Sequence, residues 1–322
     1  MSSNTKTKTN EEKRSLFDII PRIEFAWWET LCMRLGFAWL LYNRFPFLER
    51  LPHADEALTF PNGIAKWVDL TWALQPEAYL VIKSIMGFAC ILYVTGFAFP
   101  IASTALFVCF LIPCTLQNSL GSFSHYYQMM VLLLLAQALA SWIWTFAKGP
   151  RTLVQPGTAL HSFTTRVTLQ VLAGNYVLCG LTKLIISEGK WIVNSQYMPL
   201  QFEKIKMQHY YNALVEVPPN VGDKLNAYAI DNPWFSMMAY TPGLIAELGA
   251  VALLFGRAWA LWTGVFIVAM HYIIKVTMNL NFQQHEAMVW IYAANIPFWT
   301  VWLIAKALKI GSNKHELQAA GK

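Results

Sequence analysis

Nine ionisable side chains lie in or beside strongly apolar segments of this sequence. A charge is costly in such a segment, and it usually faces a bundle interior or a watery cavity. Lysine, histidine and glutamate in that setting suit acid–base chemistry on an apolar reactant, because burial adjusts how readily each group gives up its proton. The nine residues are Glu24, Glu29, Arg34, Lys83, His125, Lys183, Glu247, His271 and Lys275.

Lys183 is the strongest candidate among them for a catalytic role. It follows the segment GNYVLCGLT, and no acidic residue stands nearby in the sequence to neutralise it. A desolvated lysine loses its proton more readily, and the neutral amine is a usable base or nucleophile. We therefore predict Lys183 as a catalytic base in an apolar pocket.

Other members of the set have structural alternatives that the sequence leaves open. Lys275 can extend its ammonium group to the lipid headgroups. Arg34 would pair with a carboxylate, either Glu29 or Glu247, and this pair would be either a structural link or part of a site. His271 is as readily a hydrogen-bonded interior histidine as a ligand.

The composition predicts that membrane-spanning helices position these residues. Hydrophobic residues make up 56% of the 322 residues and charged residues 13%, and none of Asp, Glu, Lys or Arg occurs from 84 to 147. This excludes a soluble enzyme and a secreted disulfide scaffold, since ordinary soluble domains are about 25% charged. We expect an all-α polytopic membrane bundle of about eight spanning helices. The expected spans are 24–42, 79–99, 101–117, 125–147, 166–186, 241–256, 258–278 and 286–307.

The basic residues predict how the bundle is oriented. The net charge of +6 is spread over the two ends of the sequence and one central loop, which is typical of the positive-inside bias and not of a nucleic-acid surface. We therefore expect no nucleic-acid partner, a multi-pass protein of the cell (inner) membrane, and both termini in the cytoplasm. The predicted organisation is a polar cytoplasmic segment at 1–22, the bundle at 23–308 with long outer loops at 43–78 and 187–240, and a polar cytoplasmic tail at 309–322.

This topology gathers most of the intramembrane ionisable groups toward the outer half of the bilayer. His125 opens the fourth span at its outer end, and Glu247 lies about two turns into the sixth. His271 precedes Lys275 by one turn on the same helical face, and His285 follows in the next short loop. The sequence therefore predicts an outward-facing pocket.

Two segments resemble the vitamin K-dependent γ-glutamyl carboxylase family. Residues 179–191, CGLTKLIISEGKW, are similar to its AGLKKL…W stretch, with Lys183 on the second lysine and Trp191 on the tryptophan. Residues 124–137, SHYYQMMVLLLLAQ, resemble its NHSYLYGLLAFQ segment, with His125 on the histidine.

A third segment, MHYIIKVTMNLNFQQHEAMVW at 270–290, resembles the family's histidine followed by a phenylalanine and a further apolar run. The resemblance extends over roughly 20–308. It corresponds to the bacterial horizontally transferred transmembrane (HTTM) domain, which shares the carboxylase's membrane bundle.

The resemblance implies an enzyme that uses a quinol. In the family, the matched lysine deprotonates vitamin K hydroquinone, which then reacts with oxygen. The stronger base so formed removes a glutamate γ-proton, and the carbanion takes up carbon dioxide. By this resemblance Lys183 is the quinol base and His125 an acid–base or carbanion-stabilising group, with quinol, oxygen and carbon dioxide as co-substrates. The expected pocket further includes Arg34, Glu247, His271, Lys275, Trp191 and His285.

The chain also departs from the family. Thr182 stands where the family has the first lysine of its pair, and a short polar tail stands where the carboxylase carries a large luminal region that grips propeptides. We therefore expect a small lipid-soluble substrate, or a separate partner that presents one.

Two other function classes remain open. One is a maturation or immunity factor for an exported peptide, acting with a membrane partner protein that docks on the aromatic residues of 187–240 (Tyr197, Phe202, Tyr210 and Tyr211). The other is transport, or electron transfer through a haem between His125 and His271. No metal-binding or nucleotide-binding motif is present, so we expect no metal site.

Overall fold

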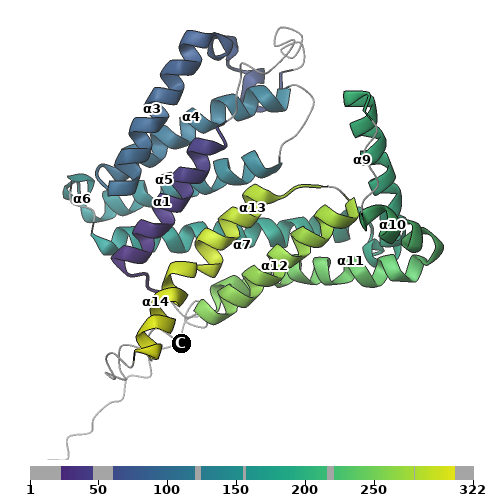
Figure 1. Cartoon of the computed structure of the whole chain (residues 1–322). Coiled ribbons are helices and arrows are strands. Elements are labelled where there is room, and N and C mark those ends of the chain that lie inside the picture. Colours follow the sequence, from purple (N-terminus) through teal and green to yellow (C-terminus); the bar gives the residue numbers. More distant parts are fainter. Residues whose placement is uncertain are drawn as a thin grey trace, which may run out of the picture.

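The computed structural model describes residues 23–45, 61–119, 125–154, 157–215, 221–278 and 280–308. Every regular element within these ranges is a helix, which confirms the all-α prediction (Figure 1). The longer helices are α1 (Trp27–Asn43), α3 (Pro76–Thr95), α4 (Phe99–Ser119), α5 (His125–Lys148), α7 (Thr158–Ile186), α9 (Met198–Ala213), α10 (Val221–Asp231), α11 (Pro233–Leu248), α12 (Arg257–Met278) and α14 (Ile296–Ala307). The short ones are η3 (Gly63–Lys66), η4 (Thr71–Leu74), α6 (Arg151–Val154), α8 (Trp191–Asn194), η5 (Ser195–Tyr197), η6 (Gly249–Leu254), α13 (Gln283–Met288) and η7 (Val289–Ala294).

Six of these helical segments are long and apolar enough to cross a membrane. They are α3, α4, α5, α7, α11 continued by η6, and α12, and the bent pair Gln283–Ala294 with Ile296–Ala307 makes a seventh if it counts as one span. Each of the eight predicted spans overlaps a helix, but α1 has only 17 residues, whereas a span needs about 20. The described residues thus form a bundle with six or seven candidate membrane spans.

The bend in the last segment has a local cause. Asn295 adopts a left-handed backbone conformation, with φ 46°, between the π-helical turn η7 and α14. Pro297 follows in the first turn of α14, where its missing N–H does not interrupt the helix. The two helical pieces meet at 42° as a result.

Hydrogen bonds between turns show which helix ends meet. The start of α7 is bonded to the segment before α1, because the Phe25 amide donates to Ser162 Oγ over 3.1 Å. The turn between α3 and α4 is bonded to α6 at the same end of the bundle. At the other end of α1, Arg44 donates to the Gln283 side chain at the start of α13 over 3.2 Å. Successive long helices therefore run up and down the bundle.

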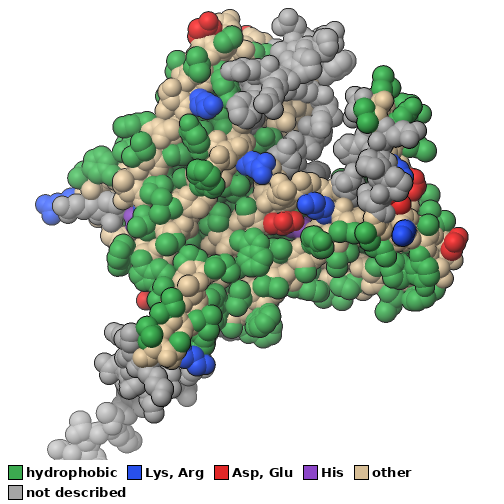
Figure 2. All heavy atoms as spheres, in the orientation of Figure 1, with side chains coloured by type: hydrophobic (Ala, Val, Ile, Leu, Met, Phe, Trp, Pro, Cys, Tyr) green, Lys and Arg blue, Asp and Glu red, His purple; other side chains and the backbone are tan. Residues whose placement is uncertain are grey.

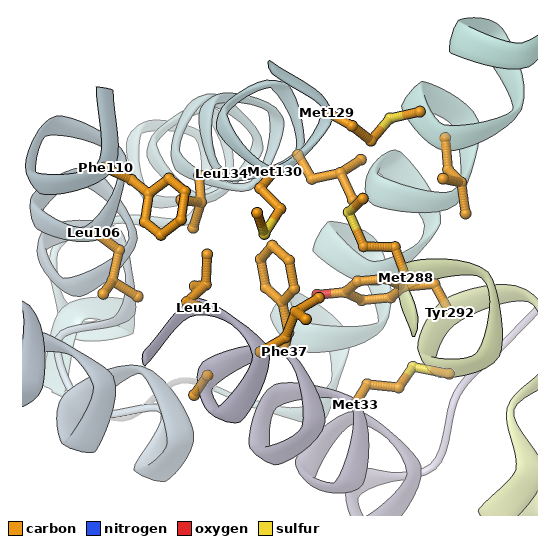
Figure 3. Close-up of a cluster of buried hydrophobic side chains, with 14 of the residues drawn as sticks. Met33, Phe37, Leu41, Leu106, Phe110, Met129, Met130, Leu134, Met288 and Tyr292 are labelled. Atoms are coloured by element: carbon orange, nitrogen blue, oxygen red, sulfur yellow. The ribbon is translucent and has the colours of Figure 1, made fainter. Parts of the chain in front are cut away.

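Helix α1 passes through the middle of the apolar core. Figure 3 shows Met33, Phe37 and Leu41 of α1 directed toward side chains of α4, α5 and the last helical segment. The Phe37 ring meets the Tyr292 ring edge-on at 5.4 Å between centroids. Much of the outer surface is apolar as well, as the green side chains in Figure 2 show, and this is typical of a surface that faces lipid.

The segment 187–240, predicted as a long outer loop, is mostly helical. It contains α8, η5, α9, α10 and the first half of α11, and α9 projects from the body of the molecule in Figure 1. Lys206 of α9 forms an ion pair with Asp223 of α10 at 2.5 Å, so the two helices are held together. These helices were predicted as a loop because their polar and charged residues make them too hydrophilic to be recognised as membrane spans. Of the other predicted loop, 43–78, the part from 61 onward contains η3, η4 and the start of α3.

Candidate functional site

Lys183 and Glu247 form an ion pair between α7 and α11. The Lys183 Nζ lies 2.6 Å from one carboxylate oxygen of Glu247 and 2.8 Å from the other. The two helices approach closely because Gly180, one turn before Lys183, has no side chain. A Cβ atom at Gly180 would lie 2.9 Å from Leu248 Cδ2 and 3.2 Å from Glu247 Cβ. The glycine thus makes room for the ion pair.

This pairing corrects the expectation that Lys183 has nothing to neutralise it. Its partner is absent from the neighbouring sequence but stands 64 residues further on. The Glu247 side chain is 8% exposed and that of Lys183 is 34% exposed. The two groups form a short, charge-assisted hydrogen bond, across which one proton can be shared. The unit able to accept or donate a proton is therefore the pair.

The ion pair borders an apolar cleft of about 280 Å³ between α11 and α12. Among the described residues that line this cleft, Lys183 is the only charged one. The Trp191 ring forms part of the wall, and the Lys183 Nζ lies 5.3 Å from its centroid, within cation–π distance. The rest of the wall is built mainly from apolar and aromatic side chains, among them Tyr240, Phe266, Met270, Ile274 and Phe282.

The size and chemistry of the cleft suit an apolar ring compound. An apolar cavity of about 150 Å³ holds a benzene molecule, so this cleft has room for a substituted one-ring or two-ring head group. A long isoprenoid tail would have to extend beyond it. The surface of α11 and α12 around the cleft is rich in exposed apolar side chains, including Met238, Ile245 and Trp262. Such a tail would therefore meet an apolar environment.

His271 and His285, predicted to line the pocket, lie behind its wall. Both are buried, at 3% and 7% exposure. Phe282 stands between His271 and the cleft: its ring lines the cleft, and the His271 ring stacks on it at 4.8 Å and 10°. The His285 ring meets the His271 ring edge-on at 5.9 Å. The two histidines therefore form a second layer behind the side chains that line the cleft.

Arg34 is also placed differently from the prediction. It belongs to another part of the bundle, where it donates hydrogen bonds to backbone carbonyls and contacts His161. The predicted pairing with Glu29 or Glu247 is wrong, because each carboxylate already has another partner. Glu29 accepts from Arg257, and Glu247 accepts from Lys183.

The two remaining predicted site residues are Lys275 and His125. Lys275 is exposed on α12 and does not line the cleft. His125 is the first residue of α5, but its side chain lies outside the described part of the chain. The predicted approach of the His125 imidazole to Lys183 therefore remains a prediction.

The uncharged residues that shape the site were missed in the sequence analysis. Gly180 stands three residues before Lys183, on the same face of α7, and this spacing was the available signal. Phe282 and Tyr240 gave no signal, because aromatic residues are common throughout this chain. Arg257, which pairs with Glu29 in another part of the bundle, was also missed, because it lies at a helix boundary.

The described residues contain no cluster of three or more His, Cys, Asp or Glu side chains placed to hold a metal ion. The five cysteines are free thiols.

No protein-family model, no curated protein and no solved structure matches this chain. The resemblance to the carboxylase bundle therefore rests on the three quoted sequence segments, and its implications for function stay predictions.

Proposed function

We propose that this protein is an integral membrane enzyme that binds a quinol-type, lipid-soluble ring compound in the cleft between α11 and α12. Lys183 and Glu247 together accept a proton from a hydroxyl group of this substrate. The observation that carries the proposal is the Lys183–Glu247 pair on the wall of an otherwise apolar cleft of about 280 Å³. A site with one charged group and apolar walls holds a greasy reactant and acts on its polar end.

The proposed reaction is oxidation of the quinol by molecular oxygen. The pair removes a hydroxyl proton, which makes the ring electron-rich and able to pass electrons to oxygen. In balance, one quinol and one oxygen molecule give one quinone and one hydrogen peroxide, so two electrons and two protons leave the ring. The pair returns its borrowed proton to the peroxide and is regenerated.

Coupling to carboxylation, with carbon dioxide as a second substrate, is the further step that the resemblance implies. It would use the quinol oxidation to generate a strong base. The role of His125 as the acid–base group of that step belongs to the same proposal.

The proposed topology has about eight spans, with α1 and the bent last segment among them. Both termini lie in the cytoplasm, and the protein resides in the cell (inner) membrane. Lys183 at the end of α7 then lies near the non-cytoplasmic headgroups. A quinol dissolved in the bilayer reaches the cleft at that depth without crossing water.

The test is quinol-dependent oxygen uptake by the full chain in lipid nanodiscs, with a short-tailed naphthoquinol as the probe. We expect Lys183→Met and Glu247→Gln each to lower the rate by about 100-fold or more, the usual contribution of a positioned base. Lys275→Met is the matched control, because it removes an exposed lysine outside the cleft, and its rate should equal that of the unchanged chain. Full activity in Lys183→Met, or no uptake by an unchanged chain that binds the probe, would refute the proposal.

A second candidate function is that of a maturation or immunity factor for an exported peptide, acting with a partner protein. The projecting helix α9 favours it, since Tyr211 is 72% exposed there, and Tyr197 just before it is 61% exposed. Phe202, by contrast, is buried, so only part of the predicted aromatic surface is available. Replacing Tyr197 and Tyr211 with Ser should abolish co-purification of an exported peptide and leave quinol oxidation unchanged.

A further inference from the structure

Arg34 is a buried cation whose partners are all neutral. The residue is 9% exposed near the middle of α1. Its Nε donates to the Thr30 carbonyl over 3.2 Å, and its Nη1 donates to the Tyr93 carbonyl over 3.3 Å. The same Nη1 lies 3.3 Å from Nε2 of His161. No carboxylate among the described residues forms an ion pair with it, so its charge lacks a counter-charge there.

The contact with His161 fixes which ring nitrogen of that histidine carries the proton. A guanidinium group can only donate, so His161 Nε2 must accept, and the proton of the neutral ring is then on Nδ1. His161 is 7% exposed, and its buried Nδ1 has no hydrogen-bond partner in the described structure. The buried unsatisfied group of this pair is therefore a donor, the Nδ1–H of His161.

Arg34 and His161 border a small cavity. Its volume is about 10 Å³, which is room for a single water-sized species. A glycine lets both side chains pack closely against the backbone: Gly96 has φ +82°, and a Cβ there would lie 2.5 Å from Arg34 Nη1 and 2.7 Å from His161 Nε2. The chain thus leaves an unfilled space beside a buried cation.

Polar side chains close the opposite wall of this cavity. The Tyr93 hydroxyl donates to Gln137 Oε1 over 2.7 Å, and Gln137 Nε2 donates to the Tyr292 hydroxyl over 3.0 Å. These three groups satisfy one another and are all buried. None of the three is a carboxylate that could balance the Arg34 charge, and none of them accepts from His161 Nδ1.

We propose that Arg34 and His161 bind a small monovalent anion of the halide class inside the bundle. A halide accepts from several N–H groups at once and supplies the missing negative charge. A water molecule in the same space would accept hydrogen bonds but leave the buried guanidinium without a counter-ion, which is unfavourable in an apolar interior. Sulfate and phosphate are too large for the space, so the site selects by size.

The experiment is thermal unfolding of the full chain in nanodiscs, with sodium chloride exchanged for sodium gluconate at constant ionic strength. A ligand that binds the folded state alone raises the unfolding temperature as its concentration rises. We expect chloride and bromide to raise it in a saturable manner and sulfate to have no such effect. Arg34→Gln should lose the chloride response, while the matched control Lys275→Gln, which removes an exposed cation, should keep it.

A second measurement covers the case in which Arg34→Gln does not fold. Chloride-35 NMR line broadening reports binding to the unchanged chain directly, and Arg34→Lys, which keeps the charge but changes the donor geometry, should bind more weakly. Equal unfolding temperatures in chloride and gluconate for the unchanged chain overturn the proposal. So does a full chloride response in a folded Arg34→Gln variant. Lys183→Met should retain the response, which separates this site from the proposed quinol chemistry.

Discussion

At the scale of single residues, the buried carboxylates of this bundle are neutralised by bases far away in the chain. Glu29 is 2% exposed and Glu247 is 6% exposed. Arg257 pairs with the first from 228 residues away, and Lys183 pairs with the second. Charges inside a bilayer are tolerated only with such partners, so each pair links two helices as well as balancing charge.

The Lys183–Glu247 pair should show strong coupling between its two members. Lys183→Met leaves a buried carboxylate without a partner, and we expect it to lower the free energy of unfolding by about 1–3 kcal/mol, a reduced range because the lysine is partly screened by solvent. Glu247→Leu should also lower the free energy of unfolding. The double variant should be more stable than the sum of the two losses predicts, as unfolding in a detergent titration will measure. Strictly additive losses would show that the pair has no energetic coupling.

The Glu29–Arg257 pair should be more sensitive, since both side chains are shielded. Arg257 is 11% exposed and Glu29 3%, and Arg257 also lies 4.0 Å from the Phe298 ring centroid. We expect Arg257→Met to cost about 3–5 kcal/mol. Lys190→Met is the control, because its pair with Glu188 is largely exposed, at 70% and 83%. A smaller loss in Arg257→Met than in Lys183→Met would contradict this ranking.

At the scale of elements, close packing of α7 against α11 positions the candidate site. Gly180 is the contact point, and the side chains of Leu248 and Glu247 on α11 fill the space that a side chain at Gly180 would need. Small residues at such crossings let two membrane helices approach closely. The separation of α7 and α11 therefore sets the distance from Lys183 to Glu247.

A single added methyl group should test this contact. Gly180→Ala places a Cβ 2.9 Å from Leu248 Cδ2, and we expect a destabilisation of about 1–3 kcal/mol together with a weaker Lys183–Glu247 pair. Gly174→Ala on the same helix meets nothing within 4 Å and should be neutral or stabilising, by up to about 1 kcal/mol. Thermal unfolding of the two variants in parallel makes the comparison. Equal effects would show that Gly180 is no closer a contact than Gly174.

At the scale of the whole molecule, the alternation of long helices puts the turn after α5 and the turn after α7 at opposite ends of the bundle. The first contains Lys148 and Arg151, and the second contains Glu188 and Lys190. The positive-inside bias assigns the first turn to the cytoplasm.

Cysteine labelling from one side of the membrane should test this orientation. In a background with the five native cysteines replaced by Ser or Ala, Glu188→Cys should react with a membrane-impermeant maleimide in intact cells. Gly149→Cys should react only after the membrane is permeabilised, because the proposed topology places its turn in the cytoplasm. The reverse pattern would invert the proposed topology and place the Lys183 cleft near the cytoplasmic face.

The sequence by itself predicted an all-helical chain with membrane-spanning segments, because the charge-free run from 84 to 147 is long enough for more than one helix that could cross a bilayer. It also singled out Lys183, since a lysine within apolar residues is rare enough to need an explanation. The sequence did not predict the helices of 187–240, because moderately polar helices give no signal of a membrane span. It also left the number of spans uncertain in detail, because α1 and the bent last segment are borderline in length.

The tertiary structure alone decided which side chain each buried charged residue contacts. Glu247 meets Lys183, Glu29 meets Arg257, and Arg34 meets His161, and none of these partners is within one helical turn of the other in the sequence. Local periodicity assigns a residue to a face of its own helix, but it does not say which helix covers that face. The pairing depends on how helices cross, and here that depends on where a glycine such as Gly180 lets two backbones come together.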